Sequence, residues 1–564
     1  MSGEYSLAQQ SWSKWLIALL IGFPTIGCAY YYYSSKSGKT KKKEEVAPQS
    51  GDALKQELPK NNHSTVTTAN GPLDQALHLK EHGNKFYKEG KYKEAVKCYS
   101  EAIDLCPVTE KDNLSALYQN RAAAYDALSN LDEVIKNCTE AIKLKPTYLK
   151  ALNRRYKACE KKGQLWQALE DITSCCYLQR FSNEDDISTA DRILKKYGQE
   201  EAKKYVKNKP TVMPSKEFIN HYLASFANDP LKDFLSEVDD TENNLNGICL
   251  AKKALKLGNY EDVLKGCTEE INLVRETSAP PSRKYYEALL LRGMMNVLIN
   301  ESVRAKADLD NVIDSPDADV TLVVSALLKR ASLHMQSVDI DEAFEDFDRA
   351  EKLLPNNSDI YHLKAQMLLL SEKTEEAILE FEKAHSLSPD FTLIQIQKYF
   401  TEFKINIEKQ DKKKANAAKL ALKQIVHDHP DLVEGHLLLA QIYNELQEFE
   451  ASEVLMNTAI SSDPTNSSIL VHRGLLYLQW KGDVEGAVKE MQKAIEIDPK
   501  CGFAYETLAS VEVQRGNILT AISLFDKALP LTKTMKEAAH ILSLKIAAQT
   551  QHSVSNKIGS FLMM

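Results

Sequence analysis

A period of about 34 residues recurs through most of this 564-residue chain and constrains its fold more than any other feature. In an early copy, small residues at Gly83, Ala95 and Ala102 are followed by Pro107. Small side chains at such spacings allow two antiparallel helices to cross closely, and proline ends a helix. The prolines that close later copies are Pro355, Pro389, Pro430, Pro464 and Pro499. The pattern predicts stacked helix pairs and an all-α fold.

The period and its small positions resemble the tetratricopeptide repeat. We expect a tetratricopeptide-repeat superhelix in two arrays. Residues 76–182 hold three copies and form an N-terminal repeat domain. Residues 183–243 break the period and are expected to be a helical connector. Residues 244–550 are expected to form a C-terminal repeat domain of about eight copies, closed by a capping helix at 536–550.

Two features of the second array resist a simple interpretation. The copy at 392–430 carries about seven extra residues, which we place around the lysine run Lys412 to Lys414. The inner stripe of the later repeats, which is expected to line a groove, is of mixed character. It includes Lys329, His362, Gln366 and Gln441. This stripe identifies no binding residues for a cargo.

The N-terminus is expected to anchor the chain in a membrane. Residues 15–35 (WLIALLIGFPTIGCAYYYYSS) carry no charge and are long enough for one helix to span a hydrocarbon core. A lysine cluster opens the basic and polar linker at 36–72, and this places the C-terminal body in the cytosol, with the tail at 1–14 on the intermembrane side. The alternative is a cleaved secretory signal, but in such signals the positive charge precedes the apolar core.

Five polar residues of the first three repeats are candidates for a peptide-binding site: Lys80, Asn84, Asn120, Lys150 and Arg154. In each repeat, positions 2, 5, 6 and 9 of the first helix form one stripe, and all five residues occupy such positions. Lysine, arginine and the asparagine amide all donate hydrogen bonds, and charged donors bind carboxylates well. The alternative is that they are ordinary solvated residues of a groove.

The segments LKEHGNKFYKEGKYKEA, LYQNRAAAY and KALNRRYKA carry these five residues. The arrangement resembles the dicarboxylate clamp of co-chaperones. That resemblance implies that the five residues bind the C-terminal Glu-Glu-Val-Asp of the 70-kDa and 90-kDa heat-shock chaperones.

With its anchor, connector and long second array, nearly the whole chain resembles the family of 70-kDa receptors of the mitochondrial outer-membrane translocase. The resemblance implies a single-pass protein of that membrane, which docks chaperones and receives hydrophobic precursors such as inner-membrane carriers. Its other implied partners are the remaining subunits of the translocase. The alternative is a clamp-bearing co-chaperone receptor at the endoplasmic-reticulum translocon.

Several function classes are excluded by the sequence. The net charge of −8 argues against nucleic acid as a partner. The ten cysteines include no Cys-x-x-Cys pair, so neither a zinc site nor a disulfide framework is expected. His427 and His429 point to different faces of a helix and are expected to be surface residues. No nucleotide-binding or catalytic motif occurs, and the repeats leave no room for a catalytic domain, so we predict no enzyme, no cofactor and no metal.

Overall fold

The computed structural model contains helices as its only regular elements in the residues that it describes. The described ranges are 71–235, 246–277, 280–337 and 339–562. The all-α fold class is therefore confirmed. The expected transmembrane anchor at 15–35 lies outside these ranges, as do the tail and nearly all of the linker. Among the described helices, none combines the length and the apolar character that a membrane span needs.

The described chain divides into two compact units. Residues 71–203 and 542–562 belong to the first unit, and residues 204–541 belong to the second. This division differs from the expected domain ranges in two ways. The connector is split between the units, and the end of the last helix groups with the first repeats rather than with the second array.

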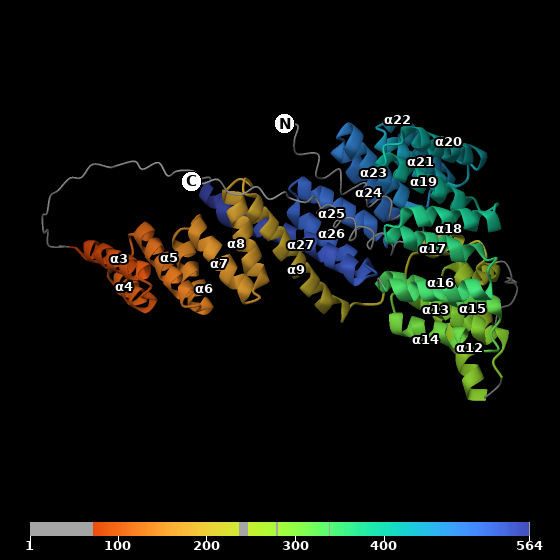
Figure 1. The fold of residues 1–564 in the computed structure, drawn as a ribbon, viewed down its shortest axis with the longest axis horizontal. Coiled ribbons are helices and arrows are strands. Elements are labelled where there is room, and N and C mark those ends of the chain that lie inside the picture. The colour runs from red at the N-terminus through yellow and green to blue at the C-terminus, as the bar shows by residue number, and fades with distance from the viewer. Residues whose placement is uncertain (1–70, 236–245, 278–279, 338, 563–564) are drawn as a thin grey trace. The chain divides into compact units, whose positions relative to one another are not determined.

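Three consecutive helix pairs form most of the first unit, and in Figure 1 the two helices of each pair lie side by side. A long helix, α9, follows them, and the end of α27 completes the unit. The bounds are α3 (Pro72–Lys88), α4 (Tyr92–Leu105), α5 (Lys111–Ala127), α6 (Leu131–Leu144), α7 (Leu149–Lys161), α8 (Leu165–Leu178), α9 (Glu184–Val206) and α27 (Met535–Leu562).

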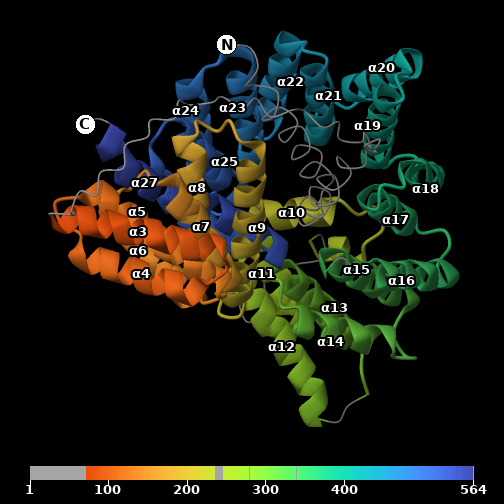
Figure 2. The same ribbon diagram turned by 60° about the vertical axis from the view of Figure 1, so that its left-hand side comes forward.

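Eight further helix pairs follow in the described part of the second unit, after the short elements α10 (Lys216–Ala224) and η1 (Pro230–Leu235). Figure 2 shows the first pairs of this series in succession. The bounds are α11 (Gly247–Leu257), α12 (Tyr260–Thr277), α13 (Arg283–Leu298), α14 (Ser302–Ile313), α15 (Val320–Ser337), α16 (Ile340–Leu353), α17 (Ser358–Leu370), α18 (Thr374–Leu387), α19 (Thr392–Glu408), α20 (Lys412–Asp428), α21 (Val433–Glu445), α22 (Phe449–Ser462), α23 (Ser467–Lys481), α24 (Val484–Ile497), α25 (Gly502–Gln514), α26 (Ile518–Ala528) and η2 (Leu529–Leu531).

The small positions of the repeat lie where the two helices of a pair meet. Ala95 and Ala102 are fully buried. At Gly83 on α3, an added Cβ would lie 2.6 Å from Cε1 of Tyr99 on α4. Only glycine therefore lets the tyrosine ring approach the α3 backbone this closely.

Where the repeat carries its proline, the second helix of the pair ends just before it, as the pattern predicted. α16 ends at Leu353, two positions before Pro355, and α22 ends at Ser462, two positions before Pro464. Proline disfavours helical geometry for the residue that precedes it, so these helices stop at a fixed repeat position.

The extra residues of the copy at 392–430 lengthen its helices instead of forming a loop. α19 and α20 each contain 17 residues. The lysine run opens α20, where the side chain of Asp411 accepts a hydrogen bond from the backbone N–H of Lys414 at 3.1 Å. The three lysines are exposed on the first turn of this helix.

Part of the connector is built into the core of the second unit. Ile219, Tyr222 and Phe226, in and just after α10, pack into the same apolar cluster as the residues of α11 to α18. The carboxylate of Asp359, on α17, accepts hydrogen bonds from the backbone N–H of Ala227 at 2.6 Å and of the next residue at 2.8 Å. The C-terminal half of the connector is therefore an internal element of the second unit rather than a free linker.

Candidate peptide-binding site in the first repeats

The five predicted site residues lie on the first helices of three successive pairs. Lys80 and Asn84 are one turn apart on α3, and Lys150 and Arg154 are one turn apart on α7. Asn120 lies on α5, which contacts both of these helices. Residues four apart share one helix face, so each pair presents two donors on one side of its helix.

Asn84 is held by two side-chain hydrogen bonds. Its Oδ1 accepts a hydrogen bond from the hydroxyl of Tyr99 at 2.8 Å and another from Nδ2 of Asn120 at 3.2 Å. Because the amide oxygen is occupied twice, the Nδ2 hydrogens are the groups left to bind a ligand. Burial raises the pKa of Tyr99 to about 12, so this hydroxyl remains a donor at neutral pH.

Arg154 lies beside one carboxylate and has an unused donor. Its Nε is 3.5 Å from Oδ2 of Asp126 on α5. Its Nη1 is buried and has no hydrogen-bond partner. A buried guanidinium nitrogen without a hydrogen-bond partner destabilises the protein. A carboxylate that bound here would supply the missing acceptor.

The two lysines of the group are unpaired in the described residues. Lys80 is half-buried on α3, and Lys150 is exposed on α7. Neither forms a hydrogen bond or an ion pair with a described side chain, so both ammonium groups are available to an acidic ligand. The structure thus links Asn84 to Asn120 directly, whereas the lysines and Arg154 make no direct bond to the two asparagines.

Neighbouring arginines that point into the repeat core were not identified from the sequence. Arg155 donates to Asp171 through two hydrogen bonds, of 2.8 and 2.7 Å, and this carboxylate is 2% exposed. In the preceding helix pair, α5 and α6, Arg121 donates a hydrogen bond to Asn137 at 2.7 Å. In both cases the two residues are 16 positions apart. The same spacing joins Arg292 to Asp308 and Arg330 to Asp346, so it is the signal that could have revealed these pairs.

The third repeat, which carries Lys150 and Arg154, is covered by the end of α27. Ile546 belongs to the apolar core that α7 and α8 share with α9. Nearer the C-terminus, Lys557 donates to Oε1 of Glu170 on α8 at 2.7 Å. The C-terminal segment therefore supports the helix that holds two of the five site residues.

The expected groove stripe of the second array is buried rather than open. This expectation was wrong for the following four residues, each at most 2% exposed: Lys329, His362, Gln366 and Gln441. Lys329 pairs with Asp229 of the connector, and His362 Nε2 lies 2.8 Å from Oε1 of Gln397. The connector and the neighbouring repeats cover the face that the repeat pattern alone predicts to be open.

A cavity of about 290 Å³ opens elsewhere in the second unit. Its lining combines apolar side chains, such as Phe218, Leu437 and Phe503, with acidic residues such as Glu217 and Asp498. These residues come from α10, α21, the end of α24 and α25. Lys209, Lys500 and Lys533 also line the cavity, so its polar lining carries charges of both signs. The cavity can therefore receive a segment that has an apolar side and a polar or charged side.

Comparison with known proteins first shows the class of repeat protein to which the chain belongs. Residues 83–111 match the family described as TPR repeat. Residues 358–391, 433–466 and 467–501 match the family described as tetratricopeptide repeat. The crystal structure of the yeast Tom70 aligns with 86% of this chain and 97% of its own at a TM-score of 0.50 and 23% identity, which supports the fold. The protein is thus a tetratricopeptide-repeat superhelix.

Two full-length relatives define the family. The mitochondrial import receptor subunit TOM70 of Rattus norvegicus is 37% identical over 576 residues, which cover 97% of this chain and 92% of the relative. The Homo sapiens protein of the same name is 36% identical over 577 residues, covering 97% and 93%. The chain therefore belongs to the family of mitochondrial import receptor subunits TOM70, as the sequence predicted, and it is a receptor rather than an enzyme.

Proposed function

We propose that the first unit docks the 70-kDa and 90-kDa heat-shock chaperones by binding their C-terminal Glu-Glu-Val-Asp. The observation that supports the proposal is the set of hydrogen-bond donors on α3 and α7 that have no partner among the described residues. Two unpaired lysine ammonium groups, the Nδ2 of Asn84 and the buried Nη1 of Arg154 belong to this set. An acidic peptide end supplies carboxylates to such donors, and charge-assisted hydrogen bonds are among the strongest that proteins form.

Peptide binding measured by fluorescence anisotropy tests this proposal. A peptide that ends in Glu-Glu-Val-Asp with a free carboxylate is expected to bind the purified chain, and its C-terminal amide is expected to bind at least tenfold more weakly. Because exposed ion pairs are screened by salt, the affinity should also fall as the salt concentration rises. Equal binding of the free acid and the amide would contradict the proposal.

We propose further that the cavity of the second unit receives precursor segments, including those of inner-membrane carriers. Its apolar lining suits the apolar side of such a segment, and its acidic and basic side chains offer partners to polar groups on the other side. Phe503→Ala is expected to weaken the binding of a carrier precursor to the full chain and to leave binding of the chaperone peptide unchanged. Unchanged precursor binding would place the cargo site elsewhere.

For the location we propose a single-pass anchor at 15–35 in the mitochondrial outer membrane, with the repeats in the cytosol beside the other translocase subunits. Family membership supports this membrane over the endoplasmic reticulum. Deletion of residues 1–35 is expected to release the protein from mitochondria into the soluble fraction on cell fractionation. Retention of the shortened chain on the membrane would contradict the proposed anchor.

A further inference from the structure

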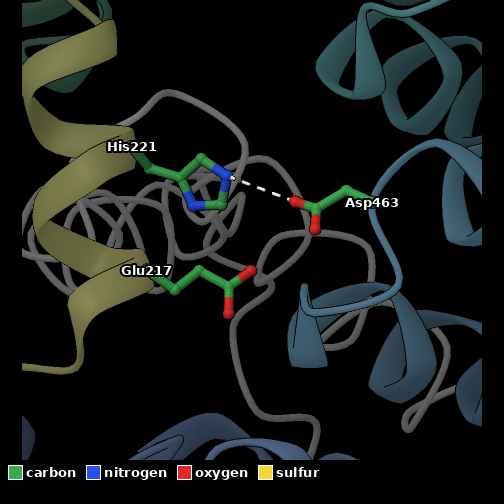
Figure 3. A group of neighbouring side chains, drawn as sticks. All are labelled: Glu217, His221 and Asp463. Atoms are coloured by element: carbon green, nitrogen blue, oxygen red, sulfur yellow. Dashed lines mark ion pairs between the residues drawn. The ribbon is translucent and has the colours of Figure 1, made fainter.

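Three metal-binding side chains meet in the second unit, away from the peptide site. Glu217 and His221 lie one turn apart on α10, and Asp463 follows the last residue of α22. One ligand atom from each residue can be chosen so that all three lie within 4.8 Å of one another. Figure 3 shows the imidazole and the two carboxylates turned toward a common point. One histidine nitrogen and two carboxylate oxygens form a donor set that divalent transition metals accept.

The group lacks the contacts that would satisfy it from within the protein. Oε1 of Glu217 is buried and has no hydrogen-bond partner. Nε2 of His221 is 3.8 Å from Oδ2 of Asp463, which is too long for a hydrogen bond. The other oxygen of Asp463 accepts hydrogen bonds from the backbone N–H and the hydroxyl of Thr465, at 3.1 and 2.8 Å. These bonds hold the carboxylate in place with Oδ2 directed at the histidine.

The charge around Glu217 also favours a cation. The carboxylate of Asp463 lies beside Glu217 in the same group of side chains. Among the described residues, no lysine or arginine forms an ion pair with Glu217 or with Asp463. Two carboxylates and one imidazole thus meet in a partly buried place without a salt bridge to a lysine or arginine of the described residues.

We propose that Glu217, His221 and Asp463 bind a Zn²⁺ ion. Ligand atoms about 2.1 Å from a tetrahedral zinc lie about 3.4 Å apart. The present separations, which are at most 4.8 Å, therefore need to close by up to about 1.4 Å, which side-chain rotation can supply. Three protein ligands leave the fourth position to water from the adjoining cavity, which Glu217 and His221 line.

A bound ion would join two elements that are far apart in the sequence. α10 belongs to the connector, whereas Asp463 precedes the turn into α23. Zinc would link this helix to the α22–α23 turn within the second unit. A ligand that binds only the folded state raises its stability, so zinc is expected to raise the unfolding midpoint of the chain.

Titration calorimetry with ZnCl₂ on the purified full chain, reduced and freed of metal with a chelator, tests the proposal. One equivalent is expected to bind. His221→Gln and Asp463→Asn should each weaken this binding at least tenfold and abolish the zinc-dependent rise in the unfolding midpoint. Asp463→Asn retains an Oδ1 for Thr465, so its metal-free fold should match that of the wild type by circular dichroism. The matched control is His427→Gln, because this histidine is exposed on α20 and distant in sequence from the three ligands.

Cobalt distinguishes this site from the cysteines. Co²⁺ bound by nitrogen and oxygen gives weak visible bands, whereas thiolate ligands add an intense charge-transfer band in the near ultraviolet. The proposal predicts the weak bands alone, lost in His221→Gln and retained in His427→Gln. A thiolate band, equal zinc binding by all variants, or no binding by the wild type would overturn it and leave His221 and Asp463 as a simple ion pair.

Discussion

Arg154 and Arg155 are adjacent on α7, but their surroundings assign them different tasks. Arg155 is held in the core by Asp171, whereas Arg154 has a buried nitrogen without a partner. Arg155→Ala is expected to lower the free energy of unfolding by about 3 kcal/mol, because it leaves a buried carboxylate uncompensated. Chemical denaturation of the purified protein measures this loss.

The double variant Arg155→Ala with Asp171→Leu supplies the control. Removing both charges should recover at least half of the lost stability, since the cost arises from the unpaired carboxylate. A loss below 1 kcal/mol in the single variant, or no recovery in the double variant, would show that the pair does not stabilise the repeat as we describe.

Tyr99 is expected to act on the peptide through Asn84. Tyr99→Phe removes the hydroxyl that occupies Oδ1 of Asn84 and keeps the ring against Gly83. The amide is then free to turn, so affinity for the chaperone peptide should fall about fivefold, in line with about 1 kcal/mol for one hydrogen bond. Anisotropy measures the effect, and Tyr177→Phe, which removes a hydroxyl from an exposed ring on α8, should bind normally. An unchanged affinity in Tyr99→Phe would show that this hydroxyl does not orient the site.

At the scale of single residues, the sequence predicts only which positions face the same side of a helix. The repeat register places Asn84 and Asn120 on corresponding stripes. The hydrogen bond between them, and the one that Tyr99 donates to Asn84, depend on the distance between packed helices. Local periodicity carries no information about that distance.

At the scale of single helices, α17 shows how burial sets pH dependence. His362 lies in a fully buried network with Gln366 and Gln397, and burial lowers its pKa to about 4. The unfolded chain takes up this proton near pH 6.5, so the contribution of His362 to stability is present above that pH and is lost as the pH falls toward 4. Between pH 7 and pH 5 the loss is about 2 kcal/mol.

The variant His362→Gln isolates this contribution. Asp359 has a pKa raised to about 6, chiefly by burial, and its effect on the pH dependence has the opposite sign. Wild type and variant are therefore compared at both pH values by denaturant unfolding. The wild type should lose about 2 kcal/mol more than His362→Gln on acidification. Equal losses would mean that His362 is not held neutral in the folded protein.

The helices and their ends were predictable because glycine, alanine and proline recur at fixed positions. The path of the connector through the second unit was not predictable from the sequence. α10 has an apolar face like any amphipathic helix, and nothing in its local pattern specifies which array it enters. The path of the connector brings Glu217 and His221 close to Asp463, and for this reason the sequence alone did not identify these three residues as metal ligands.

At the scale of the whole molecule, the C-terminal segment closes the first unit. Ending the chain after Ile541 removes Ile546 from the core of the third repeat and removes the ion pair between Lys557 and Glu170. We expect this truncation to lower the unfolding midpoint of the first unit and to weaken binding of the chaperone peptide, because α7 carries Lys150 and Arg154. Thermal unfolding and anisotropy measure the two effects.

The point variant Lys557→Ala is the control for this truncation. Its side chain is 62% exposed, so the loss of its ion pair should cost less than about 1 kcal/mol and leave peptide binding nearly unchanged. A truncated chain with wild-type stability and affinity would show that the segment after Ile541 does not support the site.

The most direct test of the central claim compares wild type, Arg154→Ala and Lys161→Ala in binding the free-carboxylate Glu-Glu-Val-Asp peptide. A charge-assisted hydrogen bond contributes about 1.5–3 kcal/mol, so Arg154→Ala should bind about 10- to 100-fold more weakly with unchanged helicity. Lys161 is an exposed cation at the end of the same helix, and its replacement should have little effect. Equal affinity of all three proteins would contradict a chaperone-docking role for this site.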